Sequence, residues 1–525
     1  NTTNGTITNL DGNFSLKVPA NATVVISYIG MKTQEIAIKG KSKIDVTLSD
    51  DAKALDEVVV IGYGTAKRKD ITGSVASVNS ETLAAIPVAS ATEALQGKMA
   101  GVQITTTEGS PDAQMSIRVR GGGSITQSNE PLFIVDGFPV ESISDIPPTD
   151  IESIDVLKDA SSTAIYGARG ANGVIIVTTK SGKEGKVSVS YNAYYAWKKV
   201  AKTLDVLSAS DYTKWQYELA QLTNKNDDYI KYFGNYQDLD MYDNVATNDW
   251  QDLTFGRTGH SFNHNLSING GSDKFKYSFS YSHIDDKAIM QMSDYARDNL
   301  NLKLNHKPLK NVSLDFSARF SKTKINGGGS NDANSSLNTD KRLKYSLLYT
   351  PYPVPGISDA LNADEEDANS LLINPLISLR DNDTRKERIN YNLAGSITWE
   401  IIKDLKLKAE VGYDDYRNNA DRYYGVTTYY VRNNVDDEDK SKPAISFTRG
   451  TRTAFRSTNT LSYDFKKFFK NNKNHLNLLA GQEYIVTRER ELRNVVHGFP
   501  TEYTADDCIN YSTKGNPYEV TNYGY

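Results

Sequence analysis

Hydrophobic and polar residues alternate along most of the chain beyond residue 187. Apolar side chains recur at every second position, for example from Val187 to Trp197 and from Ile389 to Trp399, with Ser, Asn, Lys, Asp, Thr and Glu between them. A repeat of two places each set on one face of a β-strand. About nine strands with this pattern can be counted. Apolar-outward, polar-inward alternation is typical of an antiparallel β-barrel that crosses a membrane.

The connections between these strands alternate in length as well. Short connections occur at residues 269–274, 306–311, 401–404 and 466–474, and long ones at 197–261, 322–388 and 416–447. Outer-membrane barrels combine short periplasmic turns with long external loops, whereas a soluble β-sandwich has no reason to keep this phase. An open sheet edge is not stable in lipid. We therefore expect the chain to hold only the first part of a barrel. A barrel wide enough to enclose a domain of roughly 110 residues, such as the one described next, has about 22 strands.

Residues 71–182 have a different pattern, which predicts a mixed α/β sheet domain. Helices are expected at Ala91–Met99 and Ala160–Tyr166, and the β-branched run Val174–Thr179 predicts a strand buried on both faces. Asp136-Gly137 is typical of a turn between strand ends. The expected strands are Gly73–Val78, Val102–Thr105, Ser116–Val119, Leu132–Val135, Ile154–Leu157 and Val174–Thr179.

The first 70 residues divide into two parts. Residues 1–49 predict a small all-β domain, with strands at Phe14–Val18, Thr23–Tyr28, Gln34–Ile38 and Ile44–Leu48. The sequence starts abruptly inside this domain, so a signal peptide and at least one further strand are expected before Asn1. About fifty residues are few for independent stability, which supports the expectation of a further strand. Residues 50–70 are a linker around the β-prone run Val58–Ile61. Such a run is suited to adding a strand to the sheet of another protein, although a plain strand of this chain remains an alternative.

Four segments carry a resemblance to a known family. They are DEVVVIGYGT at 56–65, IRVRG at 117–121, PLFIVDG at 131–137 and YGARGANGVIIVTTK at 166–180. Together they resemble TonB-dependent outer-membrane transporters of the SusC/RagA-like branch. The resemblance implies a carboxypeptidase-regulatory-like (Ig-like) extension at 1–49, a Ton box and linker at 50–70, a plug at 71–182 and the first part of the barrel at 183–525.

The resemblance also assigns residues to roles. Contact with TonB falls to Asp56, Glu57, Val58, Val59, Val60, Ile61, Gly62, Tyr63 and Gly64. The plug signature comprises Arg118, Arg120, Asp136, Tyr166, Gly167, Arg169, Gly170 and Gly173. In a plug, the arginines at 118, 120 and 169 are expected to meet carboxylates on the inner wall of the barrel; ordinary surface arginines are the alternative.

The implied function is active import of an oligosaccharide across the bacterial outer membrane. TonB supplies the energy and a SusD-like surface lipoprotein acts as a lid, with residues 1–70 in the periplasm and outer-membrane lipid around the barrel. A dimer of such pairs is left open. Import of peptides by the same mechanism and a TonB-dependent sensor are the alternatives.

Composition limits other functions. The single cysteine, Cys508, allows no disulfide within the chain, and the net charge of −5 argues against a nucleic-acid surface. No stretch of eighteen apolar residues predicts a membrane-spanning helix. The sequence holds no HExxH, GxSxG or Walker motif, so no enzyme activity and no cofactor are expected. Acidic runs at 364–367 and 436–439 suggest calcium, but solvated loop charge is the favoured reading.

The predicted external loops are rich in aromatic residues. Rings with a polar handle suit either sugar stacking or a protein interface. The candidates for contact with substrate or lid are Tyr232, Trp250, Tyr352, Tyr423 and Tyr430.

Overall fold

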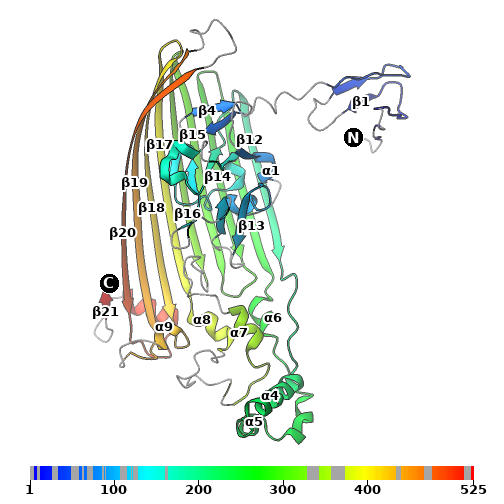
Figure 1. Cartoon of the computed structure of the whole chain (residues 1–525), viewed down its shortest axis with the longest axis vertical. Helices are drawn as coiled ribbons and strands as arrows, with labels where there is room; N and C mark the ends of the chain where they lie inside the picture. The colour runs from blue at the N-terminus through cyan, green and yellow to red at the C-terminus, as the bar shows by residue number, and fades with distance from the viewer. Residues whose placement is uncertain are drawn as a thin grey trace.

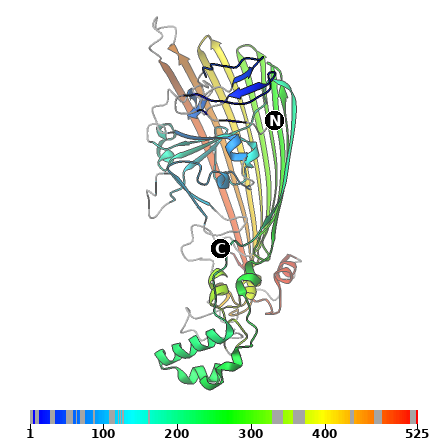
Figure 2. The ribbon, with the colours of Figure 1, turned by 90° about the vertical axis from the view of Figure 1, so that its right-hand side faces the viewer.

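The structure is a computed structural model of the 525-residue chain. It combines a large curved sheet, a smaller sheet domain against one face of it, and helical loops at one end (Figures 1 and 2). It describes all residues except 1–4, 7, 9–11, 27–33, 49–57, 62–63, 68–74, 85–87, 89, 107–114, 120, 122–123, 125–127, 160–162, 328–341, 356, 358–372, 433–438, 466–475, 514–521 and 525.

The large sheet, called the wall below, is antiparallel with its ten strands in sequence order. Nine strands are long, which confirms the number expected from the alternation, and the three-residue β21 (Asn522–Gly524) pairs with the last of them. The long strands are β12 (Gly185–Lys198), β13 (Gly259–Gly271), β14 (Phe275–Lys287), β15 (Asp294–Leu309), β16 (Val312–Asn326), β17 (Thr384–Ile402), β18 (Leu405–Tyr424), β19 (Ala444–Asp464) and β20 (Asn477–Val496).

The pairing register places the apolar positions of neighbouring strands on one face. Val189 pairs with Ile268, which pairs with Phe279, and the row continues through Leu302 to Ala318. The opposite face carries buried polar side chains, including Ser278, Ser280, Asn299, Asn301 and Asn392. The wall therefore has an apolar outer face and a polar inner face, as the sequence predicted.

The long connections carry the helices, which lie at one end of the wall, while the short turns lie at the other end (Figure 1). Helices α4 (Ala209–Thr223), α5 (Asn226–Phe233), η5 (Tyr236–Tyr242) and α6 (Trp250–Phe255) lie between β12 and β13. Helices α7 (Arg342–Leu348) and α8 (Pro375–Asp381) precede β17, α9 (Tyr429–Arg432) precedes β19, and α10 (Ala505–Thr513) follows β20. Among the described residues, no helix is long and apolar enough to cross a membrane.

The smaller domain, called the plug below, has a five-stranded mixed sheet in the order β5-β10-β11-β8-β9. Its strands are β5 (Val75–Asn79), β8 (Leu132–Val135), β9 (Phe138–Val140), β10 (Ile151–Leu157) and β11 (Val174–Thr179). The central strand β11 runs antiparallel to β10 and parallel to β8, and Val174 to Val177 are fully or almost fully buried. Strands β6 (Val102–Thr106) and β7 (Met115–Val119) form a separate pair, and α1 (Ser80–Ala84) and η3 (Pro148–Asp150) complete the plug.

Both predicted plug helices differ from the structure, and glycine explains each difference. Helix α2 spans only Ala91–Ala94, and the following turns include Gly97 in the left-handed region at φ +70°. The predicted helix at 160–166 is instead the 3₁₀ segment η4 (Ala164–Gly170), while 160–162 lie outside the described residues. Gly167 interrupts η4 at φ 60°, ψ −145°, a conformation that a helix does not contain.

The N-terminal region contains two strand pairs. Strands β1 (Thr23–Ile26) and β2 (Gln34–Ala37) are antiparallel, as are β3 (Val58–Ile61) and β4 (Gly64–Lys67). The strands predicted at residues 14–18 and 44–48 were wrong: both segments are described and neither is a strand. A segment is a strand only when its backbone groups form a ladder with a neighbouring segment, and the described residues form no strand ladder at these two places.

Candidate functional site

The turn between β8 and β9 attaches the plug to the wall. Asp136 and Gly137 both have positive φ, 51° and 85°, as a tight two-residue hairpin turn requires. The Asp136 carboxylate accepts hydrogen bonds from Thr179 N at 2.9 Å and Thr179 Oγ1 at 2.7 Å. It also accepts one from Lys303 Nζ of β15 at 2.8 Å. One carboxylate thus connects the turn, the end of β11 and the wall.

The electrostatic surroundings keep this carboxylate ionised. Burial alone raises the pKa of Asp136, but the charges of Lys303 and Arg319 and the hydrogen bonds from Lys303 and Thr179 outweigh it. The net effect lowers the pKa of Asp136 below its ordinary value. At neutral pH the contact is therefore a charge-assisted hydrogen bond between ionised groups.

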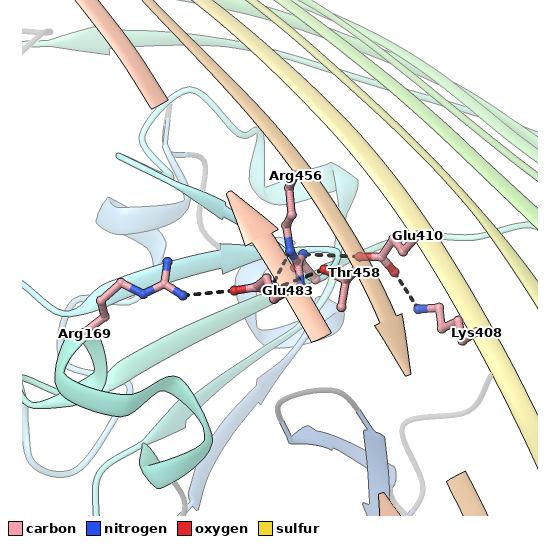
Figure 3. A network of polar contacts seen from close by, with 7 residues as sticks. Arg169, Lys408, Glu410, Arg456, Thr458 and Glu483 are labelled. Atoms are coloured by element: carbon pink, nitrogen blue, oxygen red, sulfur yellow. Dashed lines mark hydrogen bonds and ion pairs between the residues drawn. The ribbon is translucent and has the colours of Figure 1, made fainter. Parts of the chain in front are cut away.

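A second attachment centres on Arg456 of β19, whose side chain is only 6% exposed (Figure 3). Its Nε lies 2.9 Å from Glu483 Oε2 of β20, and its Nη1 lies 3.2 Å from Glu410 Oε1 of β18. Nη1 also donates to the backbone oxygen of Gly137 in the plug turn. Glu483 in addition accepts from Arg169 Nη2 of the plug at 3.2 Å. Arg456 therefore holds both wall carboxylates and the plug turn in one network.

Other contacts between plug and wall mostly pair a wall cation with a plug oxygen. Arg297 donates to Ser144 O at 2.8 Å. Arg388 lies 3.6 Å from Asp145 Oδ1, and Arg452 Nε lies 3.8 Å from Glu141 Oε2. Beside the plug, a cavity of about 60 Å³ is lined by polar groups of both parts, including Asp150, Asn301 and Asn390. A polar interface of this kind exchanges its hydrogen bonds with water more readily than an apolar core does.

The expectation that plug arginines meet carboxylates of the wall is confirmed for one arginine only. Arg169 meets a wall carboxylate, whereas Arg118 is exposed on β7 and Arg120 lies outside the described residues. The wall cations, among them Lys303 and Arg456, were not predicted from the sequence. Both occupy inward positions in strands whose alternation was recognised, and a basic residue at such a position is a signal that could have identified them.

The signature glycines allow close packing at the base of β11. Gly173 has φ +90°, and a Cβ there would come within 3.0 Å of Val119. A Cβ at Gly170 would lie 2.9 Å from Thr163 O. Tyr166 packs against a buried cluster that includes Leu157 and Val174. These positions maintain the plug fold.

The structure describes five of the nine residues predicted to contact TonB. Val58, Val59, Val60 and Ile61 form β3, which pairs with β4 beginning at Gly64. Asp56, Glu57, Gly62 and Tyr63 lie outside the described residues. In the part of the chain that the structure describes, β3 and β4 form an isolated two-stranded sheet, so the second edge of β3 carries unpaired backbone groups. Such an edge is a template for another strand.

Two of the five candidate contact aromatics are buried within this chain. Tyr352 packs among the loop aromatics Tyr212 and Phe233, and its hydroxyl bonds to that of Thr213. Tyr423 is also buried, and its hydroxyl donates to Tyr503 O at 2.7 Å. This corrects the expectation that these two rings face a substrate or lid. Tyr352 belongs to the core of the loop region, and Tyr423, near the end of β18, packs in a buried cluster with Phe499 and Cys508.

The other three aromatics are partly accessible. Trp250 donates to Thr350 O at 2.9 Å, and Tyr430 stacks on Tyr424 and His497 with centroids 4.4 and 5.6 Å apart. The Tyr232 ring lies beneath Lys231 Nζ at 4.9 Å. The acidic run at 364–367 and most of that at 436–439 lie outside the described residues. Elsewhere, the described residues contain no group of three or more His, Cys, Asp or Glu suited to a metal ion.

Known protein families match the N-terminal third of the chain. The TonB-dependent Receptor Plug Domain matches residues 67–174, and the CarboxypepD_reg-like domain matches residues 1–60. TonB-dependent receptor SusC of Bacteroides thetaiotaomicron is 40% identical over 306 residues, which cover 56% of this chain and 29% of that protein. TonB-dependent receptor P3 of Formosa agariphila is 33% identical over 498 residues, covering 92% of this chain and 45% of that protein.

The chain is a SusC/RagA-like TonB-dependent receptor. Among solved structures, the RagAB peptide importer in the open-open state superposes with a TM-score of 0.64 at 26% identity, covering 84% of this chain and 54% of that chain. This SusC/RagA-like chain spans less than half the length of the curated relatives named above. Receptors of this family are outer-membrane β-barrels, so the wall is part of a barrel and the smaller domain is its plug.

Proposed function

We propose that the complete protein imports an oligosaccharide across the outer membrane, powered by TonB and covered by a SusD-like surface lipoprotein. In this proposal β3 with its flanking residues 56–64 binds TonB in the periplasm. The plug closes the barrel at rest, and the loop helices at the opposite end contact the lid. The chain contributes no catalytic group to this function.

The observation that supports this proposal best is the order and placement of three parts. A strand pair with an open edge precedes the plug, the plug lies against the polar inner face of the wall, and the helical loops lie at the far end (Figures 1 and 2). A periplasmic protein that pulls on β3 would transmit force first to β5, which is an edge strand of the plug sheet. The fully paired β11 at the centre of the sheet would yield later.

Two substrate classes, oligosaccharides and peptides, are candidates for this proposal. The likeness to SusC, at 40% identity, accompanies a structural likeness to an importer whose title names peptides. Peptide import by the same route is therefore the second candidate. Uptake of labelled oligosaccharides and of labelled peptides by cells that express the protein with its neighbouring lipoprotein would separate the two candidates.

Deletion of Val58–Ile61 tests the transport proposal. Surface binding of the substrate should persist, whereas uptake and growth on that substrate should be lost. Deletion of four residues in the connection between β12 and β13, 200–203, serves as a control that shortens the chain without touching β3. Normal growth of the Val58–Ile61 deletion strain would overturn the proposal.

A further inference from the structure

A groove of about 290 Å³ lies on the outer face of the wall, close to the short-turn end. It crosses β14, β15 and β16 and is lined by Phe275, Leu304, His306, Leu314, Asp315 and Phe316. These three strands lie inside the sheet with both neighbours in place, so the groove is not a product of an open sheet edge. Four of the six lining residues are apolar, and His306 lies at the end nearest the short turns.

The pairing register explains the shape of the groove. Phe275, His306 and Leu314 are paired in one row across the three strands, and Leu304 and Phe316 belong to the next outward row. Gly395 of β17 continues the second row but adds no side chain, and a Cβ there would meet only Asp315 O at 3.8 Å. The side chains on β14, β15 and β16 are large, whereas Gly395 on β17 has none. This difference leaves a trough between the two rows.

The polar end of the groove is organised by one backbone oxygen. Lys274 O accepts from His306 Nδ1 at 3.1 Å and from Lys307 N at 2.7 Å. A carbonyl oxygen only accepts, so this contact places the proton on Nδ1 of His306. The Nε2 atom of the same ring then has a lone pair and only accepts hydrogen bonds, so the cationic groups at this end are the lysines.

The charge at this end is positive. The side chains of Lys274, Lys307 and Lys310 are exposed, and within the described residues none lies within ion-pair distance of a carboxylate. Asp273 is the one acidic residue in the same turn. Asp315 accepts hydrogen bonds from Asn305 and Ser396, which engage its carboxylate on the inner side.

We propose that this groove binds an anionic phospholipid of the periplasmic leaflet, with one acyl chain in the trough and the phosphate at Lys274 and Lys307. The inference rests on the membrane orientation proposed above. Lipid tails are as apolar as the trough, so the trough alone selects nothing. Selection comes from the cations, because basic residues at a membrane surface attract anionic headgroups.

A second protein is the less suitable occupant. An apolar contact between proteins would enclose the lysine side chains at the end of the groove, and lysine is depleted in the buried centres of protein interfaces. A phospholipid leaves those side chains at the aqueous boundary, where their charge is solvated and paired with phosphate at the same time.

Native mass spectrometry of the complete purified receptor tests the proposal, with phosphatidylglycerol and phosphatidylcholine as probes. The wild type should retain one phosphatidylglycerol more tightly than phosphatidylcholine. The double variant Lys274→Gln/Lys307→Gln should weaken phosphatidylglycerol binding on the order of tenfold and leave phosphatidylcholine unchanged. Leu314→Trp, which fills the trough, should remove the tightly bound lipid.

Matched controls separate groove effects from general ones. Leu393→Trp adds the same ring to the outer face of β17, and Lys199→Gln/Lys202→Gln removes two exposed lysines at the opposite end of the wall. Both should bind lipid like the wild type, and heat-modifiable migration verifies that every variant is folded. Equal affinity of the wild type for the two lipids, or unchanged phosphatidylglycerol binding in the lysine variant, would overturn the proposal.

Measurements of oligomeric state and of substrate uptake distinguish lipid binding from a protein contact and from the proposed transport function. If Leu314→Trp alters the oligomeric state and leaves lipid occupancy unchanged, the groove is a protein contact and the lipid proposal fails. Substrate uptake by wild-type cells is measured separately. Failure of uptake would reject the proposed transport function without affecting the lipid measurement on the purified protein.

Discussion

Lys303 of the wall and Asp136 of the plug lie 2.8 Å apart, and each side chain is only 15% exposed. The pair joins the middle of a wall strand to the plug turn, and the same lysine also donates to Thr179 O at 2.9 Å. Breaking one partner of a buried ion pair costs about 3–5 kcal/mol, because the other charge remains buried. This contact is therefore a main determinant of how firmly the plug is held.

The pH dependence of this attachment follows from the lowered pKa of Asp136. A carboxylate with a pKa depressed by folding stabilises the folded state above its ordinary value of about 3.9, and this contribution is lost as the pH falls through the folded value. Hydrogen-exchange protection of β8 and β9 should hold from pH 7 to about pH 5 and weaken only below about pH 4.

The variant Lys303→Met should shift that loss to higher pH, because it removes the strongest charge that lowers the pKa of Asp136. Lys322→Met is the control, since Lys322 forms its 3.2 Å pair with Glu387 at a more exposed position of the wall. Protection with the same pH profile in Lys303→Met and the wild type would show that Lys303 does not hold the plug turn.

Arg456 offers a second way to loosen the plug. Arg456→Met should leave Glu410 and Glu483 facing each other's charge and free the Gly137 carbonyl, so the plug should leak small solutes. Arg456→Lys keeps the charge but lacks the planar fork that reaches three partners, and should be intermediate. Passive entry of a small antibiotic that intact cells exclude measures the leak. Arg417→Met removes an arginine that pairs with Asp415 at 2.9 Å on the wall, and should have no effect.

The route by which the plug opens can be tested with a disulfide inside its sheet. Ala76 of β5 and Val156 of β10 are direct partners in an antiparallel pair, where the Cα separation suits a disulfide. In a Cys508→Ser background, oxidised Ala76→Cys/Val156→Cys should bind substrate but not import it, and a reductant should restore import. Either single-cysteine variant is the control. Normal import by the oxidised protein would mean that β5 stays paired with β10 during transport.

Two tyrosines in the aromatic cluster of the β12–β13 and β16–β17 connections should respond differently to replacement by phenylalanine. Tyr352→Phe removes a hydroxyl that bonds to Thr213, and should destabilise the loop by about 1 kcal/mol. The Tyr229 hydroxyl is buried without a hydrogen-bond partner among the described residues, and burial raises its pKa to about 12. Tyr229→Phe should therefore be neutral or stabilising. Proteolysis of the loop in the folded receptor measures both, and equal effects would contradict this account.

The sequence was most informative where a single physical rule determines the structure. The run Val174–Thr179 has no polar face to expose, so its place at the centre of the plug sheet followed from its composition, and its limits agree with β11. The strands of the wall were equally clear, because alternation with a period of two continues for many residues. Alternation also separates inner from outer residues, such as Lys303 from Leu302.

The sequence was less informative where contacts depend on how distant segments are placed. Alternation shows that Arg456 points inward but does not show which part of the plug lies opposite, and so the wall cations were overlooked. The same limit applies to Tyr352 and Tyr423. An aromatic residue in a predicted loop can face a ligand or join a buried cluster of its own chain, and only the folded chain distinguishes the two; Tyr423 in fact lies on β18.

The short connection between the last plug strand and the first wall strand limits how far the plug can move away from the wall. Strand β11 ends at Thr179 and β12 begins at Gly185, so five residues join them. At 3.3–3.6 Å per residue, this connection spans about 20 Å when fully extended. Wholesale ejection of the plug through the periplasmic mouth would require that β12 leave the wall with it. In the transport cycle proposed above, this short connection favours local unravelling of the plug that begins at β5, and it would keep the plug beside β12 while a barrel closes.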